Sequence, residues 1–282
     1  MVEAFTFRSE EIASWPFNEF NSPQFMVSDD ILWPPPPARW SLAGTDVHVW
    51  AAHLDQPLDA LARFASILSE DELERAARFR FEKHHNRFIA GRGILRSLLA
   101  AYLECAPDEP RFVYGPNGKP ALAGKFAQSA LRFNLAHSEE LALVAITRLG
   151  ELGVDIEKIR PLSDAGELVE RFFSARENAL FQTLPADQRN VAFFNLWTRK
   201  EAWLKATGEG IGDSLSRVEV TFLPGQPARF LALPDHCAVR ADWAVRELAP
   251  APGFVGAVAP PNVRFSLSTF QFSTSQPHWR FL

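Results

Sequence analysis

The chain has 282 residues, 47% of them apolar and 22% charged, and it carries a net charge of −5 at pH 7. This composition predicts a globular protein with one large core or two small ones, and no apolar stretch approaches the ~18 residues of a membrane helix. The acidic N-terminus shows no secretory signal, and two cysteines are too few for a disulfide framework or a zinc cluster, so we expect a cytoplasmic protein.

Residues 1–40 predict an irregular N-terminal extension. Phe and Trp are scattered among Asn, Ser and Asp, and the run from Pro34 to Pro37 favours an extended backbone without N–H donors. The aromatic side chains of this extension can still dock on the body of the protein.

A strand and two long helical segments follow. TDVHVWAA at 45–52 alternates like a strand. Residues 58–79 predict a helix that is interrupted near Ser69, because SEDE forms a good N-cap with acids in the first turn. Residues 84–103 predict the next helix.

Basic residues concentrate around the start of this helix. Residues 73–96 contain seven Arg or Lys against two acids, whereas residues 1–72 contain twelve acids against three arginines. Such a cluster of basic residues can bind a compact polyanion. A nucleic-acid-binding protein would more often be basic overall, so we expect no nucleic-acid partner. For Arg80, Lys83 and Arg92, a solvated helix face is the better interpretation.

GPNGKP at 115–120 invites comparison with a phosphate-binding loop. It lacks the GxxxxGK(S/T) pattern, since Pro120 follows the lysine, and we interpret it as a turn. Beyond it, residues 132–136 and 141–147 predict two strands. His137 follows the first strand, and taken alone such a histidine is more often structural than functional.

The GVDIEK segment at 153–158 predicts a strand with two carboxylates on one face. Because alternate side chains of a strand share a face, Asp155 and Glu157 project together while Val154 and Ile156 point into apolar packing. Taken alone, such a pair of carboxylates is most often a solvated sheet edge.

LWTRKEAWLKATGEGI at 196–211 predicts a helix that ends at Gly208. Glu201 and Lys205 stand one turn apart on this helix, which taken alone usually indicates a surface pair. Combined with the carboxylates of the strand, they supply three oxygen donors suited to Mg²⁺ and a lysine suited to phosphate. Five short strands are predicted after this helix, at 217–222, 228–233, 240–248, 254–259 and 264–270, so the order of elements predicts an α+β fold.

Together these segments resemble the signature of 4'-phosphopantetheinyl transferases of the Sfp type, (V/I)G(V/I)D(I/V)E followed by FxxxW(T/S/C)xKE(A/S)xxK. The matches are LGVDIEK at 152–158 and FFNLWTRKEAWLKATGEGI at 193–211, with RFFSARENALFQTLP at 171–185 between them. The resemblance extends upstream to YGPNGKPAL at 114–122, FNLAHSEELALVAI at 133–146 and RFRFEKHHNRFIAGRGILRSLL at 78–99. One departure is Ala136, which stands where many relatives carry a serine.

The resemblance implies two similar α+β halves packed as a pseudo-dimer, with the active site in the cleft between them. Accordingly, we expect an N-terminal half at 41–150 that binds coenzyme A, a C-terminal half at 151–272 with the metal site, and a tail at 273–282. Two similar halves in one chain favour a monomer.

The implied reaction transfers 4'-phosphopantetheine from coenzyme A to a serine of an apo acyl, peptidyl or aryl carrier protein and releases 3',5'-ADP. It depends on Mg²⁺, with Mn²⁺ as a substitute. Asp155, Glu157 and Glu201 would hold the metal, Lys205 would stabilise the transferring phosphate or its leaving group, and Glu201 or Glu157 would act as the base. The residues expected to contact coenzyme A are Arg78, Arg87, Lys119, Pro120, His137 and Lys200.

Two other functions use some of the same features. A metal-dependent phosphohydrolase acting on a nucleotide would use the carboxylates without any carrier, and a non-catalytic carrier-binding protein would lose the metal ligands. The presence of all three carboxylates and Lys205 argues against a non-catalytic protein that has lost its metal site. For carrier docking we expect a patch of Arg171, Phe172, Phe173 and Arg176, with one of the two phenylalanines buried in the core.

Overall fold

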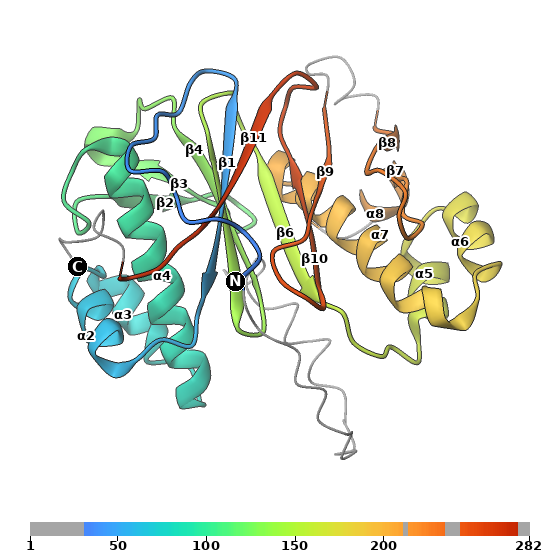
Figure 1. Ribbon diagram of the computed structural model, residues 1–282, viewed down its shortest axis with the longest axis horizontal. Coiled ribbons are helices and arrows are strands. Elements are labelled where there is room, and N and C mark those ends of the chain that lie inside the picture. The colour runs from blue at the N-terminus through green and yellow to red at the C-terminus, as the bar shows by residue number, and fades with distance from the viewer. Residues whose placement is uncertain (1–30, 211–213, 235–242, 276–282) are drawn as a thin grey trace.

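Two α+β bodies make up the protein, and their sheets lie between two outer groups of helices (Figure 1). The computed structural model describes residues 31–210, 214–234 and 243–275. The helices in these ranges are α2 (Leu58–Ser66), α3 (Glu70–Ala76), α4 (Glu82–Leu103), α5 (Ala165–Phe172), α6 (Ala175–Gln182), α7 (Ala186–Thr207) and α8 (Ser214–Arg217), with a 3-10 turn at Gly124–Phe126. The strands are β1 (Asp46–His53), β2 (Arg111–Tyr114), β3 (Pro120–Ala123), β4 (Arg132–Ser138), β5 (Leu141–Thr147), β6 (Gly153–Lys158), β7 (Glu219–Val220), β8 (Phe230–Ala232), β9 (Arg246–Leu248), β10 (Phe254–Ala259) and β11 (Ser266–Gln271).

The first body is a sheet covered on its outer face by α2, α3 and α4 (Figure 1). Its strand order is β11-β1-β5-β4, in which β5 pairs antiparallel with both β1 and β4. Leu95 and Leu98 of α4 pack in one buried cluster with Trp50 of the sheet. The predicted break between α2 and α3 is confirmed at Ser69, whose backbone N–H donates to Glu72 Oε2 at 3.0 Å.

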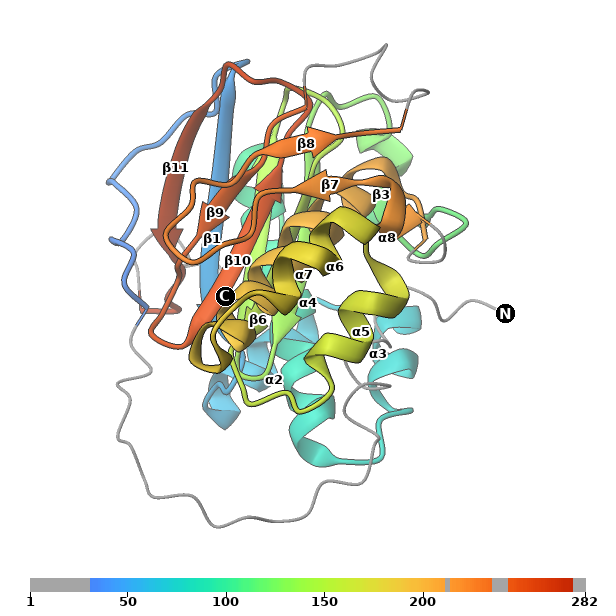
Figure 2. The same ribbon diagram turned by 90° about the vertical axis from the view of Figure 1, so that its right-hand side faces the viewer.

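The second body has the antiparallel strand order β6-β10-β9, with α7 on its outer face and α5 and α6 beyond α7 (Figure 2). Its construction repeats that of the first body. In each, the first strand of the sheet is followed by two shorter helices, a 22-residue helix and, later in the chain, two more strands of the same sheet, the second of which lies between the other two strands. The predicted pair of similar α+β halves is therefore confirmed by topology.

An apolar layer joins the inner faces of the two sheets. Val47 and Val49 of β1 share one buried cluster with Val154 and Ile156 of β6. At the seam between the bodies, the Val154 N–H donates to Asn134 Oδ1 of β4 at 2.8 Å. The first strand of the second body therefore lies directly against the first body.

The C-terminal part of the chain differs from the prediction in two places. β11 pairs in parallel with β1, so residues 266–271 belong to the first sheet and the expected division at 151–272 is wrong there. A parallel partner needs a long crossover and has no local signal in the sequence. The strand predicted at 217–222 is shorter, because α8 occupies residues 214–217 and leaves only β7.

The described part of the N-terminal extension docks on the body, although it has no regular secondary structure. The Leu32 N–H donates to the Pro250 carbonyl oxygen at 2.8 Å, and the Trp40 ring lies edge-on to Trp50 with centroids 5.4 Å apart. Residues 1–30 and 276–282 lie outside the described residues, so the predictions made for them stay predictions. None of the described helices is long and apolar enough to cross a membrane.

Candidate active site

Glycine allows β6 to lie in direct contact with α7. A Cβ atom on Gly153 would lie 2.0 Å from the Ala202 carbonyl oxygen and 2.5 Å from the Ala206 backbone nitrogen. No side chain fits at these distances, so any other residue at this position would separate the strand from the helix. The close approach brings Asp155 opposite the last turn of α7.

We expect Gly153→Ala to destabilise the protein by about 1–3 kcal/mol, the usual cost of overpacking, because the added methyl group meets rigid backbone atoms. Urea unfolding measures the change. The control is Gly44→Ala, since nothing lies within 4 Å of an added Cβ there. Equal stability of the two variants would show that β6 and α7 are not in close contact.

Asp155 and Lys205 form an ion pair at the contact between β6 and α7. Lys205 Nζ lies 2.5 Å from Asp155 Oδ1. Burial raises the pKa of Asp155, and the Lys205 charge opposes this rise. Within the described part of the chain, the buried Asp155 Oδ2 has no hydrogen-bond partner, so the protein satisfies only one oxygen of this carboxylate.

Glu157 lies on the same face of β6, as the alternation predicts. Ser138 Oγ donates to Glu157 Oε2 at 2.9 Å, and the Arg160 guanidinium lies 3.6 Å from the same oxygen. Burial raises the pKa of Glu157 to about 7, and the neighbouring Asp155 charge adds to the rise. The two carboxylates therefore repel each other where they are partly shielded from water. This repulsion favours the binding of a cation beside them.

Glu201, on α7, completes the carboxylate set around Lys205. Burial lowers the pKa of Lys205, but Asp155, Glu201 and Glu157 outweigh this effect and raise it. Among the described residues, no three acidic, histidine or cysteine side chains are gathered closely enough to hold a metal ion. In this arrangement the Lys205 ammonium is the cation that lies among the carboxylates.

His137 brings an imidazole from the first body to the same region. Although the residue as a whole is exposed, desolvation of its imidazole by the surrounding protein lowers its pKa to about 4, and the charges of Lys205, Arg87 and His84 lower it further. The ring is therefore neutral near pH 7 in a cationic surrounding that favours anions. His84 was not predicted as a site residue. The basic residues around it in the sequence were the only feature that could have indicated a role in the site.

Arg87 and Arg78 occupy different settings. The buried Arg87 guanidinium makes a two-pronged contact with Asp55, with N···O distances of 2.6 and 2.7 Å, and also lies 3.5 Å from Glu139. A phosphate would have to displace Asp55 to bind there. Arg78 lies in the exposed turn between α3 and α4. The contacts of both arginines with coenzyme A stay predictions.

Lys119 lies in the turn between β2 and β3 and reaches into the second body. Its Nζ donates to Glu151 Oε2 at 2.7 Å and to the carbonyl oxygens of Leu152 and Ala206 at 3.1 and 3.0 Å. All three N–H donors of this ammonium have acceptors in the protein, so a phosphate would have to displace one of them, and the contact of Lys119 with coenzyme A stays a prediction. Pro120 begins β3, and its contact with the nucleotide stays a prediction.

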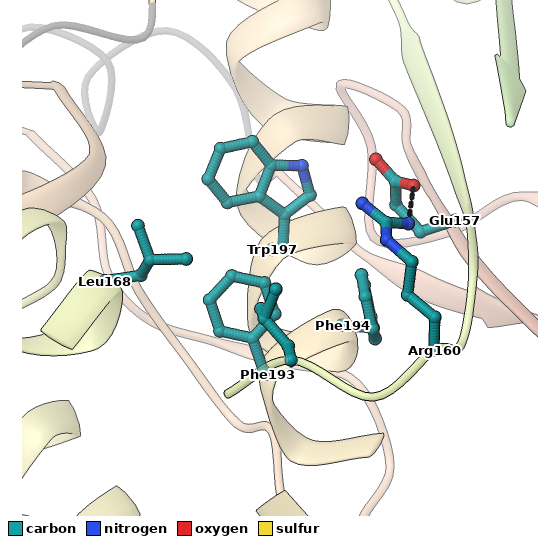
Figure 3. A pocket seen from close by; sticks show the side chains of 7 residues that line it. Glu157, Arg160, Leu168, Phe193, Phe194 and Trp197 are labelled. Carbon is teal, nitrogen blue, oxygen red and sulfur yellow. Dashed lines mark ion pairs between the residues drawn. The ribbon is translucent and has the colours of Figure 1, made fainter. Parts of the chain in front are cut away.

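A hollow opens beside Glu157 between β6, α5 and α7 (Figure 3). Its walls are largely apolar: the rings of Phe193 and Trp197 stack with centroids 6.0 Å apart, and Leu168 lies across from them. Arg160 and Glu157 form the charged wall of the hollow (Figure 3).

Comparison with known sequences shows the family to which this chain belongs. A model of the 4'-phosphopantetheinyl transferase superfamily matches residues 151–250, and a model of the N-terminal region of 4'-phosphopantetheinyl transferases matches residues 52–148. The chain is 45% identical to the 4'-phosphopantetheinyl transferase HetI of Nostoc sp. over 227 residues, which cover 80% of this chain and 92% of HetI. The chain belongs to the 4'-phosphopantetheinyl transferase superfamily.

Other superfamily members are similar over shorter stretches. Identity to the 4'-phosphopantetheinyl transferase psf-1 of Bacillus pumilus is 32% over 187 residues, covering 64% of this chain and 77% of psf-1. Identity to Sfp of Bacillus subtilis is 28% over 174 residues, covering 61% of this chain and 75% of Sfp. The sequence-based interpretation as a member of this family is therefore confirmed.

In this family member, Lys200 has a structural position. Its side chain is fully buried, and Nζ donates to Glu177 Oε2 at 2.5 Å and to the Leu215 carbonyl oxygen at 2.7 Å. In this arrangement Lys200 is held by protein partners, and its contact with coenzyme A stays a prediction. Glu177 also accepts a hydrogen bond from the Val220 N–H at 3.0 Å. At the start of α6 it forms a capping box with the N-cap residue Ser174. The RFFS and KEA segments are thus joined in the interior of the second body.

Proposed function

We propose that this protein transfers the 4'-phosphopantetheine group of coenzyme A to a serine of an apo acyl, peptidyl or aryl carrier protein and releases 3',5'-ADP. The observation that carries the proposal is the grouping of Asp155, Glu157 and Glu201 around Lys205, beside the cationic surrounding of His137. Acidic side chains and a lysine from the second body meet anion-favouring groups of the first body at the seam. This combination suits a substrate with several phosphates.

The carboxylates suit a divalent cation by their chemistry, although among the described residues they are not gathered closely enough to hold one in this arrangement. Asp155 has a buried oxygen without a protein hydrogen bond within the described residues, and the pKa of Glu157 is raised by burial and by Asp155. Oxygen donors of this kind suit Mg²⁺, or Mn²⁺ in its place, and we propose Asp155, Glu157 and Glu201 as the ligands. When bound, the ion would neutralise charge on the pyrophosphate of coenzyme A.

The remaining steps belong to side chains of this chain. A new bond forms between the carrier serine Oγ and the β-phosphorus of coenzyme A, while the bond to the oxygen that leaves with 3',5'-ADP breaks. Glu201 or Glu157 takes the serine proton. The Lys205 ammonium is placed to stabilise charge on the phosphate or the leaving oxygen, because phosphoryl transfer depends mainly on positioning and electrostatics.

One surface of the second body suits the docking of the carrier. Arg171 and Arg176 are exposed on α5 and α6 and Phe172 is half-buried, which supports the predicted docking patch for the carrier. Phe173 is buried against Phe193, as expected for one of the two phenylalanines. We propose that the protein works as a monomer, because the two bodies of one chain form the site.

Incubation with coenzyme A and Mg²⁺, with and without an apo carrier, tests the proposal against its alternatives. We expect the carrier to gain the mass of phosphopantetheine, and 3',5'-ADP to form only when the carrier is present. Breakdown of coenzyme A without a carrier would indicate a phosphohydrolase. Carrier binding without a mass change would indicate a non-catalytic partner.

The stability of the metal-free protein should fall as the pH rises through about 7. The pKa of Glu157 is raised in the folded state, so its contribution to folding is complete below its unfolded pKa and is lost above the folded value of about 7. Thermal unfolding in EDTA between about pH 5 and about pH 8 measures this loss. Glu157→Gln should reduce the slope, whereas the exposed control Glu167→Gln should leave it unchanged. An equal slope in both variants would contradict the assignment.

A further inference from the structure

One ammonium of the first body contacts the second body on both sides of the Asp155–Lys205 pair. Lys119 donates to the carbonyl oxygen of Leu152, immediately before β6, and to that of Ala206, in the last turn of α7. Leu152 lies three residues before Asp155 in the chain, and Ala206 directly follows Lys205. The same lysine therefore joins the start of the strand to the end of the helix.

The contact with Lys119 stabilises the end of α7 more than an ordinary side-chain hydrogen bond would. The last four carbonyl groups of a helix have no partner within the helix, and the negative end of the helix dipole favours a cation. Lys119 supplies both a donor and a positive charge at that end. Asn117, in the same turn, adds a second cap by donating from Nδ2 to the Gly208 carbonyl oxygen at 2.6 Å.

The Lys119 side chain is largely enclosed by the protein. Its side chain is only 13% exposed, and its third donor is taken by Glu151, which lies on the surface and also pairs with Arg132 at 2.9 Å. Lys125, on the same segment of the first body, is by contrast 60% exposed and pairs with Glu109. The chain thus offers an exposed lysine for comparison with the enclosed one.

We propose that Lys119 is a positioning residue that holds β6 and α7 at the spacing required by the Asp155–Lys205 pair. The turn at 115–119 then connects the first body to the catalytic helix of the second. This inference rests on the proposed function, because it assigns Lys119 to the alignment of the transferring groups and not to the binding of a phosphate.

The test compares Lys119→Met, which keeps the apolar stem, with Lys119→Arg and with the control Lys125→Met. Three quantities are measured: kcat for transfer to the carrier, the dissociation constant of 3',5'-ADP, and hydrogen exchange of the backbone amides in residues 203–208. A misplacement of about 1 Å at a reacting centre can cost ~10²-fold in rate, so we expect Lys119→Met to lower kcat by at least about tenfold. It should leave the 3',5'-ADP dissociation constant within about threefold and speed exchange at the end of α7.

Lys119→Arg should recover part of kcat and of the exchange protection, and Lys125→Met should match the wild type in all three quantities. If Lys119→Met does not fold, Lys119→Gln, which removes the charge but keeps an amide donor, is measured in the same way. A large rise in the 3',5'-ADP dissociation constant with unchanged kcat and unchanged exchange would overturn the proposal and make Lys119 a phosphate ligand. Unchanged values of all three quantities would overturn it as well. If the wild type transfers nothing, the proposed function fails, and the exchange rates still decide whether Lys119 holds α7.

Discussion

Asp155→Asn should lower the rate of phosphopantetheine transfer by on the order of 10²–10³-fold, the usual loss when a preorganised electrostatic contact is removed. The substitution keeps the shape of the side chain but removes the charge that pairs with Lys205 at 2.5 Å. It also removes one of the three carboxylates proposed to hold the metal. Initial rates at saturating coenzyme A and carrier measure the effect.

The exposed Asp59, which pairs with Arg63 on the surface of α2, provides the matched control for Asp155→Asn. Asp59→Asn should transfer at the wild-type rate. Thermal unfolding of both variants separates loss of catalysis from loss of fold. Near-normal turnover of Asp155→Asn, or full wild-type activity in excess EDTA, would refute the assignment of the carboxylate cluster as the metal site.

Lys200→Met should destabilise the protein by about 3–5 kcal/mol, because it leaves the Glu177 carboxylate buried without its cation. The loss should appear in urea unfolding even without any substrate. Combining it with Glu177→Gln should restore much of the stability, since the amide oxygen can still accept from Val220 while no charge is left buried.

The control for this prediction is Arg63→Met, which breaks a solvent-exposed pair and should cost no more than about 0.5 kcal/mol. A change below about 1 kcal/mol for Lys200→Met would contradict the buried structural pair. Lys200 would then be available to a ligand, as the sequence first indicated.

Local patterns in the sequence predicted much of the framework of the site. The alternation of GVDIE places Asp155 and Glu157 on one face of β6, with Val154 and Ile156 in the apolar layer between the sheets. This part of the prediction is confirmed because side-chain direction in a strand depends only on parity along the chain. The helix that carries Glu201 and Lys205 is likewise present and ends at Gly208, whose φ of 75° suits glycine.

Long-range partners could not be read from the sequence. Lys200 and Lys119 each belong to a conspicuous motif, but their roles depend on acceptors 23 and 87 residues away, Glu177 and Ala206. A lysine buried against a carboxylate and a lysine that binds a phosphate have the same local sequence signal. The parallel pairing of β11 with β1 is hidden for a related reason, since nothing near β11 specifies its partner.

We propose that the carboxylates and Lys205 of the second body transfer phosphopantetheine from coenzyme A held beside His137. The most direct measurement follows holo-carrier and 3',5'-ADP in the same reaction for the wild type and for Glu201→Gln, together with coenzyme A binding by each protein. We expect equal amounts of the two products from the wild type, and almost none from a Glu201→Gln variant that still binds coenzyme A. Transfer at the wild-type rate by Glu201→Gln, or 3',5'-ADP formed without holo-carrier, would contradict the proposal.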